Sequence, residues 1–141
     1  MEKTNEKKLK RYVVLKLVNE LDGVDGRTKF QKLIFIGQKE LGLPEVFKFS
    51  GYYYGPYSKD LTETIEALIK IGLLNEEVKV KDEYIEYIYT ITEEGKGALK
   101  GLEREIRKKL PKTVISHLRD FKKMSRNEVI GYVYGKYMHS S

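Results

Sequence analysis

The spacing of apolar residues along the first third of the chain predicts two amphipathic helices. Apolar side chains recur every three or four positions between lysines over residues 4–21, the repeat of one buried helix face. Residues 22–26 break this pattern. Thr28 and Gln31 have the spacing of a capping box, so a second helix is expected to begin there and to end at Gly42-Leu43-Pro44. The apolar positions of the two helices are Leu9, Tyr12, Val13, Leu17 and Leu21, then Phe30, Leu33, Ile34, Gly37 and Leu41.

An aromatic segment and a third helix follow. Residues 46–54 are rich in Phe and Tyr, which favour an extended, half-buried strand. Gly55-Pro56 predicts a tight turn after it. Ser58 is the expected N-cap of the third helix and Gly72 its stop, with apolar positions at Leu61, Ile65, Leu68 and Ile69.

The remaining pattern predicts a hairpin and three further helices. Residues 73–80 and 84–91 are strand-like and are separated by three polar residues, so they should pair. Thr92 can cap a fourth helix, which Pro111 interrupts. A short fifth helix with apolar positions Val114, Ile115, Leu118 and Phe121 precedes a second capping box, Ser125 with Glu128, which opens a last helix through Tyr137.

The fourth helix has an unusually narrow apolar stripe. Such a stripe is typical of a helix-pairing seam rather than of a wide core-facing surface. A homodimer through this seam and the C-terminal helices is therefore expected. The seam residues are Leu99, Leu102, Ile106 and Leu110.

The order of three helices, a two-stranded hairpin and another helix predicts the fold class. It is that of a mostly α, α+β winged helix-turn-helix with extra C-terminal helices. Residues 1–98 are expected to form the winged-helix core. Residues 99–141 are expected to form a helical extension that packs on the core or builds the dimer seam, within one domain overall.

Several stretches resemble known families. Residues 89–96, Tyr-Thr-Ile-Thr-Glu-Glu-Gly-Lys, resemble the junction that closes the hairpin in many winged-helix regulators. Residues 26–35, 52–61 and 132–137 resemble the YwgA-like family of uncharacterised proteins, and the Gly-Pro turn is similar to that of phage-associated, antitoxin-like winged-helix proteins. These resemblances imply a fold more firmly than a function, and no catalytic or ligand residue carries over from them.

Composition narrows the function classes. The 141 residues include 40% hydrophobic residues, enough for one core, and no cysteine, which fits a reducing cytoplasm and excludes thiolate sites. There is no apolar run of about 20 residues that could cross a membrane. The richness in Lys and Glu with few thermolabile residues is typical of a thermophile. The formal charge of +6 favours an anionic partner without being a strongly basic coating.

Double-stranded DNA is the first partner that this pattern predicts. Basic residues at the start of the second helix can hold phosphate oxygens, or can form an ordinary solvated face. Lysines near the hairpin tip lie where winged helices commonly contact a phosphate backbone. The candidate DNA-binding residues are Arg27, Lys29, Lys32, Tyr57, Lys59, Thr62, Lys79 and Lys81.

Two features oppose a simple DNA reader. About fifteen residues separate the second and third helices, where a helix-turn-helix has about 3–4. The outward face of the third helix carries Glu63 and Glu66 beside Thr62 and Lys70, and glutamates repel phosphates. The alternative is therefore a winged-helix protein-interaction module, antitoxin-like or associated with phage or defence systems, whose third helix binds a basic partner.

Two other clusters have competing interpretations. The tyrosines at 52, 53, 54 and 57 can form a stacking platform, but alternate residues of an extended strand face opposite ways, which favours a split between core and rim. Arg104, Arg107, Lys108, Lys109 and Lys112 are either a strip for backbone contacts or, as we favour, charges that complement a helix C-terminus.

Catalysis is poorly supported, and neither an enzyme nor a cofactor is expected. His117 and His139 are the only histidines, so Cys–His and metal-binding constellations have too few ligands. The pairs Glu93-Glu94 and Glu103 with Glu105 lack any sign of an apolar pocket, and Gly95-Lys96-Gly97 lacks the spacing of a phosphate-binding loop.

Overall fold

The computed structural model describes residues 2–51, 55–106 and 110–137. Their secondary structure is mostly helical with a small sheet, as the apolar spacing predicts. The elements are α1 (Glu2–Glu20), β1 (Val24–Asp25), α2 (Arg27–Glu40), α3 (Lys59–Lys70), β2 (Leu74–Val80), β3 (Ile85–Ile91), α4 (Glu93–Glu105), α5 (Lys112–Lys122) and α6 (Arg126–Tyr137).

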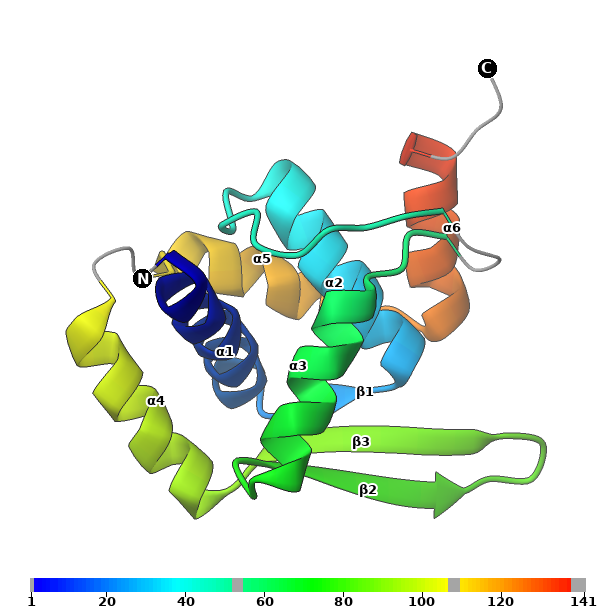
Figure 1. Cartoon of the computed structure of the whole chain (residues 1–141). Coiled ribbons are helices and arrows are strands. Elements are labelled where there is room, and N and C mark those ends of the chain that lie inside the picture. Colours follow the sequence, from blue (N-terminus) through cyan, green and yellow to red (C-terminus); the bar gives the residue numbers. More distant parts are fainter. Residues whose placement is uncertain (1, 52–54, 107–109, 138–141) are drawn as a thin grey trace.

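Two helices form the centre of the core. In α1 the run from Tyr12 to Leu15 is fully buried, and α2 is buried at every position from Lys29 to Gln38. Figure 1 shows α4 alongside α1, α5 and α6 beside α2, and α3 in front of α2 above the hairpin. Because both central helices are covered on several sides, their polar residues must find partners inside the protein.

The sheet has three antiparallel strands in the order β1-β3-β2. The hairpin of β2 and β3 is confirmed, with Leu74 opposite Ile91 at its base and Val80 opposite Ile85 at its outer end. The two-residue strand β1 was not predicted, because residues 22–26 read only as a helix break. It pairs Val24 with Tyr89 on the free edge of β3.

Three of the four predicted side-chain caps are confirmed. Leu61 N–H donates to Ser58 Oγ (3.2 Å), and Gly95 N–H donates to Thr92 Oγ1 (2.9 Å). Ser125 and Glu128 form the reciprocal capping box, with distances of 2.9 and 3.1 Å. All three depend on residues within one turn, which is why the sequence alone reveals them.

The capping box predicted at Thr28 is wrong. Helix α2 begins one residue earlier, at Arg27, after Gly26 with φ of 103°, and no side chain caps it. The Gln31 amide, which the capping box requires, points instead into the protein and binds the turn before α3.

The strand predicted over residues 46–54 is also absent from its described part, residues 46–51. Only an isolated bridge joins Ser50 to Tyr57. The main chain is held instead by the second glutamine of α2: Gln38 Nε2 donates to Phe47 O (2.9 Å), and Phe47 N–H donates to Gln38 Oε1 (3.0 Å). A side-chain amide thus takes the place of a neighbouring strand.

The apolar stripe of the fourth helix does not form an exposed seam. Helix α4 ends at Glu105, so Leu110 lies beyond it, and both Leu99 and Leu110 are buried in the core. Leu102 and Ile106 pack against the same core. Since α1 covers this stripe within one chain, the stripe is not available for the dimer interface that its narrowness suggested.

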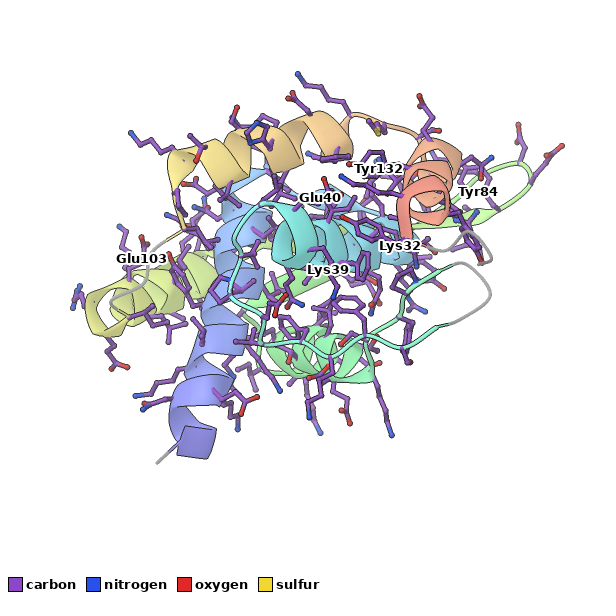
Figure 2. The ribbon with its side chains drawn as sticks, turned by 90° about the horizontal axis from the view of Figure 1, so that it is seen from above. Lys32, Lys39, Glu40, Tyr84, Glu103 and Tyr132 are labelled. Carbon is purple, nitrogen blue, oxygen red and sulfur yellow. The ribbon has the colours of Figure 1, made fainter. Side chains whose placement is uncertain are left out.

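The C-terminal helix is fastened to α2 by one carboxylate. Glu40 accepts hydrogen bonds from the hydroxyls of Tyr132 (2.8 Å) and Tyr137 (2.5 Å), and its carboxylate lies 3.1 Å from Lys136 Nζ. Figure 2 shows Glu40 and Tyr132 side by side. Burial raises the pKa of Glu40, but these three donors outweigh burial and hold the pKa below its usual range.

We predict that Gln31→Leu destabilises the protein by about 1–3 kcal/mol, because it leaves the buried N–H of Ser58 without a partner; the Ser58 C=O loses one donor but still accepts from the Thr62 N–H. Urea denaturation followed by circular dichroism measures this loss. Lys39→Leu, at an exposed position of the same helix, is the matched control. An equal effect of both variants would contradict the role of the Gln31 amide.

We predict a smaller effect for Ser58→Ala, a loss of about 0.5–2 kcal/mol from removal of the α3 cap. Ser58→Thr should recover part of it, since Thr also caps helices. Denaturation midpoints identical for the wild type and Ser58→Ala would contradict the prediction.

Candidate functional site

A cleft of about 260 Å³ opens between the first half of α2, α3 and the hairpin. Its walls are largely apolar: Phe30 and Tyr89 meet edge to face with ring centroids 5.4 Å apart, and Ile65 and Ile69 line the α3 side. The remaining lining residues are Arg27, Thr28, Gln31, Lys32, Tyr57, Thr62, Glu66 and Glu76. An apolar cleft with a few convergent polar groups is the usual form of a binding site.

A chain of hydrogen bonds forms one side of the cleft. Gln31 Nε2 donates to Thr62 Oγ1 (3.0 Å), and the Thr62 hydroxyl donates to the Tyr57 hydroxyl (2.9 Å). Gln31 also donates to Ser58 O (3.0 Å) and accepts from Ser58 N (2.8 Å). The cleft wall and the α3 cap are therefore positioned by the same amide.

Arg27 lies at the mouth of the cleft. Its guanidinium carbon is 3.8 Å from the centroid of the Tyr87 ring, its Nε donates to the Tyr89 hydroxyl (3.1 Å), and its Nη2 lies 3.4 Å from Glu76 Oε2. Burial, followed by the proximity of Glu76, raises the pKa of Tyr89. Tyr89 therefore stays neutral at physiological pH, and the partly exposed Arg27 joins α2 to the hairpin.

Lys32 lies at the other end, under the Gly55-Pro56 turn. Its side chain is almost fully buried, and Nζ donates to Pro56 O (2.8 Å). Burial, and then the positive charge of Arg126, lowers the pKa of Lys32 to about 8. Gly55 has φ of 103°, and a Cβ there would lie 3.2 Å from Lys32 Cε, so the turn favours glycine above this side chain.

The structure brings together four of the eight candidate DNA-binding residues at the cleft: Arg27, Lys32, Tyr57 and Thr62. Lys29, in contrast, is 5% exposed; Nζ lies 3.2 Å from Asp25 and donates to Lys122 O (2.9 Å), which ties α2 to α5. The expectation that Lys29 and Lys32 form a solvent-facing grip on phosphates is therefore wrong, because both amines point into the protein.

The other three candidates lie outside the cleft lining and are exposed. Lys59 is in the first turn of α3, and Lys79 and Lys81 belong to the outer end of the hairpin. Of the second basic cluster, Arg104 and Lys112 are exposed, as is His117. Tyr52, Tyr53, Tyr54, Arg107, Lys108, Lys109 and His139 lie outside the residues that the structure describes.

The most unusual surface was not predicted. Val78, Val80, Tyr84 and Ile85 are 52%, 82%, 61% and 53% exposed, and all belong to the outer half of the hairpin. Figure 2 shows Tyr84 at the end of the hairpin. The alternation of apolar residues was visible in the sequence, but nothing local revealed that the core covers only the inner half of this face.

Comparisons with known proteins give a relative without an assigned role. No known family profile matches the chain. Over 86 residues the chain is 37% identical to the uncharacterised protein YwgA of Bacillus subtilis, a match that covers 61% of this chain and 51% of the relative. The chain thus matches about half the length of this curated relative. This similarity supports the resemblance to YwgA-like proteins and assigns no function.

The described residues contain neither a membrane-spanning helix nor a metal-binding cluster. No helix there has the length and apolarity needed to span a membrane. No group of three His, Cys, Asp or Glu side chains there is placed to hold a metal ion.

We predict that Lys32 makes the protein more stable as pH rises from about 8 to 10.5. In this range the unfolded lysine still binds a proton that the folded one has released, so the free energy of unfolding increases with pH. Urea denaturation of the wild type and of Lys32→Met at pH 8 and pH 10 measures this contribution. All other titratable groups are the same in the two proteins, so the difference between their pH dependences is due to Lys32. Equal pH dependence in the two proteins would contradict it.

Proposed function

We propose that the chain is a winged-helix protein-interaction module that binds a partner polypeptide through the outer hairpin face and the adjoining face of α3. The order of α1, α2, α3, the hairpin and α4 is compatible with a winged helix. Residues 41–58 separate α2 from α3 and replace the short turn of a helix-turn-helix.

The observation that carries this proposal is the division of the hairpin. On one face of the sheet, Leu74 and Ile91 at the base are covered by the core, while the pairs Val78–Tyr87 and Val80–Ile85 continue the same face outward. Contiguous exposed apolar residues on a soluble domain mark interaction sites. The hairpin extends beyond the helices, which leaves this outer part accessible (Figure 1).

The charges next to this face favour a basic partner over a nucleic acid. Glu66 is exposed on α3 and lines the cleft between α3 and the hairpin, whereas the exposed Glu63 lies on the side of α3 that faces α1. A suitable peptide would pack apolar residues against the hairpin and pair a Lys or Arg with the carboxylates of α3. The same carboxylates would repel phosphates.

DNA binding is the second candidate, and exposed lysines favour it. Lys59, Lys79 and Lys81 are accessible to a phosphate backbone. Lys79 belongs to the strand face opposite Val78 and Val80, where Glu86 is its cross-strand neighbour, so the hairpin offers an apolar side and a side of mixed charge. The two candidates therefore require different faces and can be separated by substitution.

We predict that the double variant Val78→Ser, Val80→Ser no longer binds a partner protein that the wild type binds. Crosslinking in the source cells followed by affinity purification measures this binding. Both positions are exposed, so stability should change by less than about 0.5 kcal/mol. Lys79→Ser with Glu77→Ser on the opposite face is the matched control and should retain the partner. Equal capture by all three proteins would overturn the role of the apolar face.

A salt-titrated DNA-binding assay tests the second candidate. If phosphate contacts through the hairpin lysines dominate, Lys79→Ala with Lys81→Ala lowers the slope of log affinity against log salt by about 2. Glu66→Lys should then strengthen DNA binding, whereas it should weaken a basic protein partner. If the wild type does not bind DNA at about 50 mM salt, the proposal that the partner is DNA is excluded.

A further inference from the structure

Lys32 is a buried cation that has no carboxylate partner among the residues that the structure describes. It is 3% exposed, and its Nζ donates a hydrogen bond to the Pro56 carbonyl. Within the described ranges Nζ forms no ion pair with a carboxylate, and the charge that acts on Lys32 is the positive one of Arg126. An ammonium ion has three donors and is costly to bury unpaired, so ordinary packing does not account for a lysine here.

Lys32, although buried, belongs to the wall of the cleft. Lys32 is part of the cleft lining together with the Tyr57 and Thr62 side chains, and apolar walls formed by Phe30, Ile65 and Ile69 complete it. A ligand that enters between α3 and the hairpin would therefore meet apolar surface along its length and a positive charge at one end. This combination matches an acid with a hydrocarbon body.

We propose that the cleft binds a small organic monocarboxylate, whose carboxylate pairs with Lys32 and whose apolar body packs between α3 and Phe30. The cleft adjoins the partner surface proposed above, with which it shares Glu66, and monocarboxylate binding can be tested on the protein alone. The ligand chemistry is a single negative charge on an apolar group of roughly the cleft's size, about 260 Å³.

The charges around the cleft favour one negative charge over several. Arg27 and Lys32 are balanced by Glu66 and Glu76 among the lining residues. Glu76 pairs with Arg27 at the mouth, which leaves Lys32 and Glu66 as the other lining charges, so a negative group is favoured beside Lys32 and a second one is disfavoured by Glu66. A phosphate ester with two negative charges would approach Glu66 and Glu76 before reaching Lys32, which disfavours it.

The charged form of Lys32 is needed for the pairing. The titratable groups around Lys32 come from several elements. They are Arg27 of α2, Tyr57 just before α3, Glu66 of α3, Glu76 of β2, and Arg126 and Tyr134 of α6. Since burial and Arg126 lower the pKa of Lys32 to about 8, the free amine loses its proton above that pH. Carboxylate binding then requires proton uptake, and its affinity falls with rising pH.

The experiment is a calorimetric and NMR titration of the full chain with hexanoate, hexanamide and hexylammonium at pH 7. We expect hexanoate to bind at least about tenfold more tightly than its neutral amide, the effect of one charge-assisted pair, and hexylammonium not to bind. Shifted resonances should include Phe30, Thr62 and Ile65. Equal affinity for hexanoate and hexanamide, or no hexanoate binding at all, overturns the proposal.

The variant Lys32→Met separates a ligand-binding lysine from a structural one. We expect it to lose the preference for hexanoate while it remains folded at pH 7, because replacing a buried unpaired charge by an apolar chain of similar volume offsets the lost hydrogen bond to Pro56 O. Lys39→Met, seven residues along the same helix and exposed, should keep the preference (Figure 2). A lowered melting temperature with the preference intact assigns Lys32 a structural role and overturns the proposal.

A wild-type measurement covers the case in which Lys32→Met does not fold. Hexanoate affinity at pH 9 should be about tenfold below that at pH 7, as protonated Lys32 becomes scarce. The Lys39→Met protein should show the same decline. An affinity independent of pH from 7 to 9.5 would overturn the role of Lys32.

Discussion

Two side-chain amides on α2 determine how the middle of the chain is arranged. Gln31 and Gln38 are the only glutamines in the sequence, and each binds both the N–H and the C=O of one residue in the long connection between α2 and α3. A connection of this length without a strand would otherwise leave buried backbone groups unpaired. Because the two glutamines are seven residues apart on one helix face, the connection follows α2 and delivers Ser58 to begin α3.

This arrangement explains which parts of the fold the sequence could predict. Helix caps at Ser58, Thr92 and Ser125 and the pairing of β2 with β3 depend on neighbours close in sequence, and all were predictable. The Gln31 interaction spans 27 residues, and local spacing made it look like a capping box. Pairing of β1 with β3 joins residues more than sixty positions apart and had no local signal at all.

The candidate site was predicted in part for the same reason. Arg27, Lys32, Tyr57 and Thr62 were selected as polar or aromatic residues near helix starts, and they do converge on one cleft. Their spacing could not reveal that Lys29 and Lys32 are buried, because that depends on α5, α6 and the Gly55-Pro56 turn covering α2. Nor could the alternating pattern of β2 show where the core ends along the hairpin.

The hairpin is buried at its base and exposed at its outer end, so mutations at the two ends have different consequences. Its base, with Leu74 and Tyr89, shares the packing of the whole domain, so changes there affect folding. Its outer end touches little else, and mutations at Val80 or Tyr84 alter what the surface offers while the scaffold tolerates them. Duplicated copies of such a domain could therefore diverge in recognition by drift at a few outer positions, and residues 78–85 are a natural site for grafting a foreign binding sequence.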